Sequence, residues 1–312
     1  MPTNPIFNMN FPSQSFPVVR QQGLTIIEIV AVIVISSILG IGVVGFIGNA
    51  VEGISTSRDR SEIASAGRVA IDRLAFELHN ALPNSIRTTA ATSGGDQCIE
   101  FIPIRAATSY INPPFSTSGT TFDVVDFIPS QHGVNGGYAV IYPRRQNFLY
   151  DGDNGPSSGW PNFPNRRPIQ EISTIANSAT ADQSTVTLIK AHRFRRRSPS
   201  QRFFVVEDPI SYCIAGDKMY RYTNYGFYAS QVSQEEQSGV CEVALNQTCL
   251  PNYSAAPDKM LITDSIDNTG VTAFSVSNQS LARNSIVSIE LNMSANGENI
   301  QLNHEVLTRS VP

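Results

Sequence analysis

The sequence predicts an α+β protein in which a long amino-terminal helix packs on an antiparallel β-sheet head. Three observations predict this fold class. Residues 24–47 are almost wholly apolar, and residues 49–82 repeat apolar side chains at three- and four-residue steps. Beyond Asp96, short segments rich in Val, Ile, Tyr, Phe and Thr alternate with Gly, Pro, Asn and Asp, as expected for strands and turns.

The net charge of the chain does not indicate a class of partner, and the sequence lacks several common catalytic motifs. The 312 residues carry a formal net charge of −4. No nucleophile elbow, phosphate-binding loop or dinucleotide fingerprint occurs, and the cysteines and histidines lack the spacing of zinc ligands. We therefore expect a protein that is not an enzyme and that has neither a cofactor nor a structural metal.

The amino-terminal part divides into a polar leader and an apolar segment. Residues 1–23 are rich in Pro, Asn and Gln, and residues 1–22 are expected to be disordered. Residues 24–47 are long enough for a helix to cross a hydrocarbon core of about 30 Å. Their only charged side chain is Glu28, and a carboxylate in hydrocarbon needs a partner, so its place predicts a function.

Residues 48–83 are expected to continue the helix in an amphipathic form. Pro83 and the polar residues after it predict the helix end, so one helix is expected from about 24 to 82. Residues 84–312 would form the head. The apolar stripe that would pack on the head comprises Ile63, Ala66, Ala70, Leu74, Leu78 and Leu82.

The head is predicted to consist of strands joined by turns. Tight turns between paired strands are expected at Gly216-Asp217 and Asn296-Gly297. The expected strands are 98–104, 121–128, 137–142, 184–191, 202–208, 210–215, 218–223, 259–266, 272–277, 284–293 and 299–311.

Four cysteines after a membrane segment indicate two disulfides in an oxidising compartment, with free buried thiols as the alternative. Four cysteines allow three connectivities. Cys241 and Cys249 bracket a short loop, so we predict a Cys241–Cys249 pair and, by elimination, a Cys98–Cys213 pair.

The residues Gly23-Leu24-Thr25-Ile26-Ile27-Glu28 resemble the class III leader junction of type IV prepilins and type II secretion pseudopilins. In that family a prepilin peptidase cuts after the glycine on the cytoplasmic side and N-methylates the new amino terminus. The resemblance implies that Gly23 ends the leader, that Leu24 is the methylated first residue, and that Glu28 pairs with the α-amino group of an adjacent subunit during assembly. The chain departs from the family in having Leu instead of the usual Phe at position 24, and Arg20 as its nearest basic residue.

The segments 68–87, 98–104 and 210–227 resemble the large minor pilins of the PilW and general secretion protein J kind, among them those of the mannose-sensitive haemagglutinin (MSHA) pilus. This resemblance implies a pilin-like fold and a minor pilin that takes part in assembly or priming of a type IV pilus. The implied location is the bacterial inner membrane, with a single span, a cytoplasmic amino terminus and a periplasmic head, and later the pilus or pseudopilus. The implied partners are the prepilin peptidase, other major and minor pilins, the inner-membrane assembly platform and membrane lipid. The alternatives are a type II secretion pseudopilin and a pilus-tip adhesin or DNA-binding minor pilin.

A basic region lies in the middle of the chain, where residues 140–205 carry ten Lys or Arg against four Asp or Glu. A polyanion site would use the run Arg193, Arg195, Arg196 and Arg197, with Phe194 or Trp160 stacking on bases. We favour a solvated or inter-subunit charged loop over DNA binding, since arginines also pair with acidic neighbours. The other arginines of the region are Arg144, Arg145, Arg166, Arg167 and Arg202.

Residues 151–155, DGDNG, begin like a calcium loop, with Asp151 and Asp153 as the ligands. The fifth position is Gly155, and no acid follows until Glu171, so a late bidentate glutamate is lacking. We therefore favour a polar surface turn over a metal site here.

Overall fold

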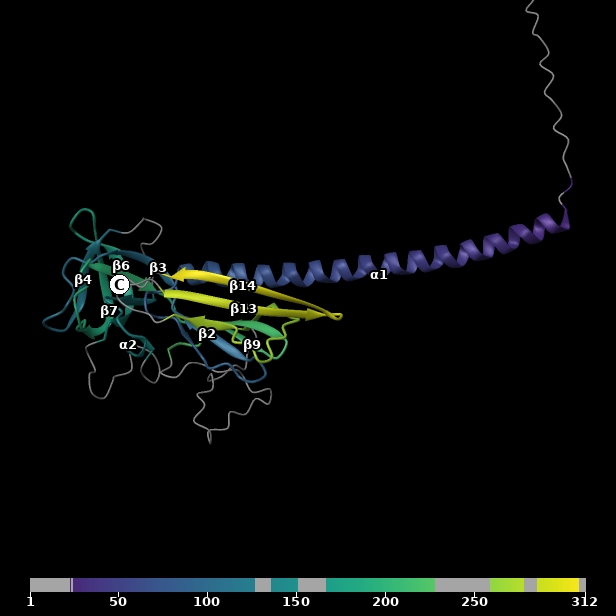
Figure 1. Cartoon of the computed structure of the whole chain (residues 1–312). Helices are drawn as coiled ribbons and strands as arrows, with labels where there is room; N and C mark the ends of the chain where they lie inside the picture. Colours follow the sequence, from purple (N-terminus) through teal and green to yellow (C-terminus); the bar gives the residue numbers. More distant parts are fainter. Residues whose placement is uncertain are drawn as a thin grey trace, which may run out of the picture. The chain divides into compact units, whose positions relative to one another are not determined.

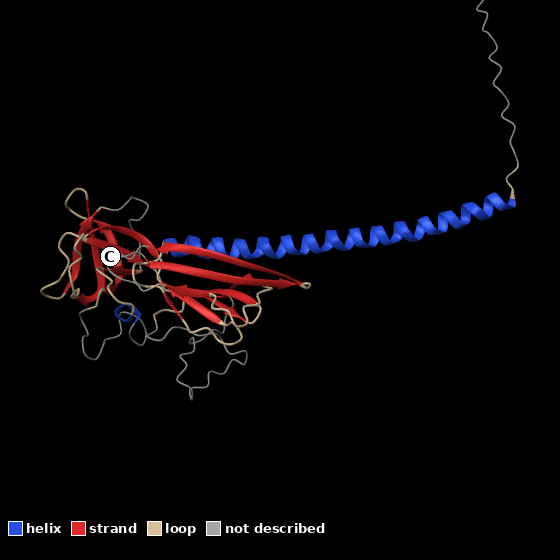
Figure 2. Ribbon diagram, viewed as in Figure 1, coloured by secondary structure: helices blue, strands red, loops and turns tan. Residues whose placement is uncertain are grey.

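The computed structural model describes residues 23, 25–126, 136–150, 167–227, 259–277 and 285–308. The chain divides into two compact units, Met1–Ser55 and Thr56–Pro312. Helix α1 (Ile26–His79) supplies residues to both units, and Figure 2 shows that strands form most of the regular structure that follows it.

In the first unit, the described residues are exposed, and those from Ile26 onward form the first half of α1. Its large apolar side chains from Ile26 to Ile47 are exposed. This half of α1 is long enough and apolar enough to span a membrane.

In the second unit, one face of α1 is buried against the sheets. Gly67 lies where the helix meets the last two strands, because a Cβ atom there would be 2.4 Å from Cδ1 of Leu302. Figure 1 shows these two strands running along the last turns of the helix. The buried residues of α1 are Ile63, Gly67, Ala70, Ile71, Leu74, Ala75 and Leu78.

The helix ends at His79, three residues before the predicted end at Leu82. The amide of Leu82 donates to the carbonyl of Ile102 at 2.7 Å, and Ala81 forms an isolated antiparallel bridge with Pro103. A continuing helix would need the Leu82 amide to bond to the carbonyl of Leu78. The prediction was wrong here because a contact distant in sequence takes this amide before Pro83 is reached.

In the part of the chain that the structure describes, all strand pairs are antiparallel and form three sheets. The first has the order β1 (Arg87–Thr88), β2 (Gln97–Phe101), β9 (Ile210–Ala215), β10 (Lys218–Tyr222), β11 (Lys259–Thr263). The second has the order β12 (Phe274–Val276), β13 (Ser285–Ala295), β14 (Glu298–Thr308). The third has the order β3 (Ile104–Ser109), β8 (Arg202–Val206), β5 (Tyr138–Val140), β6 (Ile169–Asn177), β7 (Gln183–His192), β4 (Gly119–Val125).

The main core joins α1 to the first two sheets. It contains the buried face of the helix, aromatic side chains such as Phe101 and Tyr212, and inward residues of β13 such as Val287 and Leu291. A second core is formed mainly by side chains of the six-stranded sheet and includes the edge-on ring contact of Phe122 with Phe203. The α+β class and the antiparallel sheets are therefore as predicted.

Both predicted tight turns are present. Gly216, between β9 and β10, has a φ of 60°, and Asn296 and Gly297, between β13 and β14, have φ of 52° and 82°. Two consecutive positive φ values are typical of the type I′ turn, which Asn-Gly favours. The prediction missed strand β6, whose buried Ile169, Ile172 and Ile175 recur every third residue.

A disulfide joins Cys98 of β2 to Cys213 of β9, and these residues are direct partners in the strand register. Of the two predicted disulfides, this is the one with the greater sequence separation, 115. Cys241 and Cys249 lie outside the described residues.

Candidate functional site

The predicted processing junction lies at the start of α1. Gly23 and Thr25 are exposed, and a side chain at position 23 would meet nothing within 4 Å. Leu24, the predicted methylated residue, lies outside the described residues.

Glu28 lies in the first turn of α1. Its amide donates to the carbonyl of Thr25 at 3.1 Å and lies 3.4 Å from the Thr25 hydroxyl oxygen. Thr25 and Glu28 thus have the spacing of a capping box, and the carboxylate lies near the positive end of the helix dipole. Helix capping is a local structural reason for an acid at this position, in addition to the predicted role in assembly.

The arginine run after β7 does not form one continuous patch. Arg193 donates to the carbonyl of Ser116 at 3.0 Å, and the guanidinium of Arg197 lies 4.9 Å from the Phe115 ring centroid. Arg195 instead lies over the ring of Phe148, at 4.1 Å from its centroid. The predicted polyanion site is therefore divided between two places.

Phe194 does not offer a stacking face to a base, so the less favoured DNA-binding interpretation loses this residue. It is 1% exposed, and its ring contacts Phe122 and His192 edge-on. Trp160, the other expected stacking residue, lies outside the described residues.

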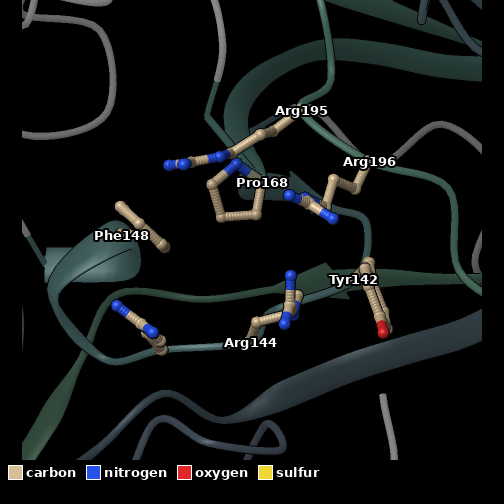
Figure 3. A pocket seen from close by; sticks show the side chains of 7 residues that line it. Tyr142, Arg144, Phe148, Pro168, Arg195 and Arg196 are labelled. Atoms are coloured by element: carbon tan, nitrogen blue, oxygen red, sulfur yellow. The ribbon is translucent and has the colours of Figure 1, made fainter.

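Arg195 and Arg196 form a pocket of about 280 Å³ with two arginines that lie far away in sequence (Figure 3). Arg144 and Arg145 come from the segment that leads from β5 to the single helical turn α2 (Asn147–Tyr150). These segments meet because β5 pairs with β6 and β8, while β6 pairs with β7. The described lining residues are Tyr142, Arg144, Arg145, Phe148, Pro168, Arg195 and Arg196.

The sequence placed Arg144 and Arg145 in the basic region but did not single them out as a site. Their only sequence signal is their charge, because the strand pairing that brings them to Arg195 is not visible in the sequence. Arg166 lies outside the described residues.

His192, at the end of β7, supports the loop that carries Arg195. Its ring is 2% exposed, and Nε2 lies 3.0 Å from the carbonyl oxygen of Arg167, to which it donates. Burial lowers the pKa of His192 to about 4, which keeps the ring neutral at physiological pH.

A buried ion pair between Arg87 and Glu100 lies beside α2. Arg87 Nε donates to Glu100, whose other carboxylate oxygen accepts from the Tyr225 hydroxyl at 3.0 Å. The Arg87 guanidinium also lies 3.7 Å from the centroid of the Tyr150 ring, on α2. Burial raises the pKa of Glu100, and the attraction of Arg87 opposes that rise.

The calcium ligands that the sequence offered, Asp151 and Asp153, lie outside the described residues. In the ranges that the structure describes, no group of three or more His, Cys, Asp or Glu side chains could hold a metal ion.

The features that could carry function are the exposed apolar half of α1, with Glu28 in its first turn, and the arginine-lined pocket of the head. Their interpretation depends on the chain's own residues. Comparison of the chain with protein-family models, curated proteins and solved structures finds no match.

Proposed function

We propose that this protein is a minor pilin, a membrane-anchored structural subunit that takes part in assembly or priming of a type IV pilus of the MSHA kind. One observation carries the proposal: a 54-residue helix exposes an apolar first half, with Glu28 as its only charged side chain before Glu52, and buries one face of its second half against a β-sheet head.

The exposed half of α1 needs an apolar environment. Its large side chains are 47–83% exposed from Ile26 to Ile47, which is far more apolar surface than a soluble monomer exposes. A bilayer would cover this surface before assembly, and the helices of neighbouring subunits would cover it in a filament. Small residues support close helix packing, and a side chain would meet nothing within 4 Å at Gly40, Gly42, Gly45 and Gly48.

The junction supports processing by a prepilin peptidase. Cleavage after Gly23 would leave Leu24 as an N-methylated amino terminus, four residues before Glu28. In an apolar filament core, the Glu28 carboxylate and the α-amino group of a neighbouring subunit would attract each other strongly, because a low dielectric screens their attraction less than water does. Such a pair would fix the register between subunits.

The head would then act by recognition and not by catalysis. Its partners in this proposal are other major and minor pilins and the inner-membrane assembly platform, while the anchor contacts lipid. The chain would reside in the inner membrane with its head in the periplasm until it enters the pilus.

The direct test is mass spectrometry of the mature amino terminus. The full chain is expressed in a bacterium with an active prepilin peptidase and, in parallel, in one that lacks it. We expect a chain beginning with methylated Leu24 in the first strain and an uncut chain in the second. A chain that still begins at Met1 when the peptidase is active would refute the proposal.

Glu28→Gln tests the pairing step separately. Glutamine keeps the capping-box spacing with Thr25 but removes the charge, so insertion and cleavage should continue while incorporation into filaments falls. Glu52→Gln removes the next charge along the same helix and should leave incorporation unchanged. Deletion of the gene separates the alternatives: lost pili indicate a minor pilin, whereas lost protein export with intact pili indicates a type II secretion pseudopilin.

A further inference from the structure

We infer that the head contains a preformed binding pocket for a phosphate or sulfate ester, formed by Arg144, Arg145, Arg195 and Arg196. This inference does not depend on the proposed function, because it concerns only the second unit of the chain. The sequence suggested a polyanion site on one continuous arginine run. The pocket instead combines two residues of that run, Arg195 and Arg196, with Arg144 and Arg145 from another segment.

Among the described residues, the pocket concentrates positive charge with no acidic side chain in its lining. Its seven described lining residues include four arginines. Over the described ranges, none of these four arginines forms an ion pair with an acidic side chain. Like charges around one cavity repel each other, and an anion between them removes that repulsion.

Two of the guanidinium groups are held in place by aromatic rings. Arg195 lies over Phe148 at 4.1 Å, and Arg144 lies 5.7 Å from the centroid of Tyr142. Cation–π contacts of this kind reduce the freedom that the side chains would otherwise lose when a ligand binds. The pocket is therefore partly organised before an anion enters.

The wall that carries Phe148 is fixed to the core. The next two residues, Leu149 and Tyr150, are 0% and 1% exposed, and the Tyr150 hydroxyl donates to the carbonyl of Ser85 at 2.8 Å. Arg144 adds a second indication of a ligand, because its Nε is buried and has no hydrogen-bond acceptor among the described residues. Buried donors are nearly always satisfied, so this atom needs an acceptor that the described residues do not supply, such as a ligand oxygen.

Size and donor geometry define the ligand class. A cavity of about 280 Å³ is at the small end for organic ligands and suits a single sugar or base ring with one ester group. Guanidinium forks match pairs of oxygens on phosphate or sulfate. A second cavity of about 540 Å³ shares Arg144 and Arg145 and is also lined by Arg87, so the rest of a longer ligand could extend there.

The test is isothermal titration calorimetry of the full chain in detergent micelles, with pyrophosphate and a sulfated chondroitin disaccharide as the probes. We expect saturable binding of at least one probe that weakens as salt is added. The double variant Arg195→Gln/Arg196→Gln should lower the affinity by at least about tenfold, since two charge-assisted contacts are removed.

The matched control is the double variant Arg193→Gln/Arg197→Gln, which removes the same charge from the same loop but away from the pocket. It should bind as the unmodified chain does, and equal thermal midpoints would show that both variants are folded. Binding of pyrophosphate alone would identify a phosphoryl group as the part of the ligand that the pocket recognises, and binding of the disaccharide alone a sulfated glycan. Equal weakening in both variants, or no saturable binding of either probe, would overturn the inference.

Discussion

Arg87 and Glu100 form an ion pair with an Nε–Oε2 distance of 2.6 Å, and the Glu100 side chain has no exposed surface. The pair joins β1 to β2 and is extended by Tyr225, whose hydroxyl lies 2.7 Å from the Ser211 hydroxyl. Burial of these two charges costs desolvation free energy, and their mutual attraction offsets this cost only while both side chains are present.

Arg87→Gln should therefore destabilise the head by about 3–5 kcal/mol, since it leaves a buried carboxylate without its cation. Burial already raises the pKa of Glu100, and loss of Arg87 raises it further. A carboxyl with a raised folded-state pKa stabilises the fold at low pH and loses that contribution as pH rises through this pKa. The measured loss of unfolding free energy in urea should thus be greater at pH 8 than at pH 5.

Arg73→Gln is the control for this variant. Arg73 pairs with Glu77 at 3.7 Å on the surface of α1, with 44% of its side chain exposed. Such a pair contributes less than about 1 kcal/mol. Equal losses in the two variants would contradict the special role of the buried pair.

His192 should make the head sensitive to mild acid. Its folded-state pKa is lowered to about 4 by burial, from an ordinary value of 6.5. The neutral ring therefore stabilises the fold above pH 6.5, and this contribution, about 3 kcal/mol from the difference in pKa, is lost as pH falls toward 4. Unfolding by urea at pH 7 and pH 4.5 would measure the loss.

His192→Gln separates this effect from other titrating groups. Glutamine can still donate to the Arg167 carbonyl but does not take up a proton. We expect a smaller loss of stability between the two pH values in the variant. An unchanged difference would show that carboxylates, and not His192, cause the acid sensitivity.

Gly95→Ala should strongly destabilise the turn before β2. Gly95 has a φ of +87°, and a Cβ atom there would lie 2.3 Å from the backbone oxygen of Asn268. Strain and overpacking should together cost about 2–4 kcal/mol, which would appear as a lower thermal midpoint. Gly94→Ala is the neighbouring control, since its Cβ would meet only the Thr92 hydroxyl at 3.8 Å.

Removal of the Cys98–Cys213 disulfide by a double change to alanine should lower the unfolding free energy by about 4–5 kcal/mol, because the bond closes a loop with a sequence separation of 115. Chemical denaturation of the oxidised proteins would measure this effect. If the variant unfolded at the same denaturant concentration as the unmodified chain, the bond would not constrain the unfolded state as expected.

Local patterns predicted much of the fold. The stripe from Ile63 to Leu78 marks the face of α1 that is buried, and Asn296-Gly297 marks the turn of the last hairpin. Strand β6 was missed because a bulge between Ile172 and Thr174 breaks the two-residue alternation that identifies strands.

The pocket could be predicted only in part. The sequence identified Arg195 and Arg196, but residues in extended loops have no period that tells which way they point. Arg193 and Arg197 turned out to contact Ser116 and Phe115 instead. Arg144 reaches the pocket only through the pairing of β5 with β6 and β8, a relationship between distant segments.

The main core has a consequence for how the protein is made. It joins α1, near the beginning of the chain, to β13 and β14, near its end, where Met293 and Leu302 lie against Gly67. The helix is synthesised before β13 and β14, so its buried face can pack against these strands only after they have left the ribosome. The nascent head therefore completes its core only when the final hairpin has been synthesised, and a chain stopped before β13 would keep the Gly67 side of the helix exposed.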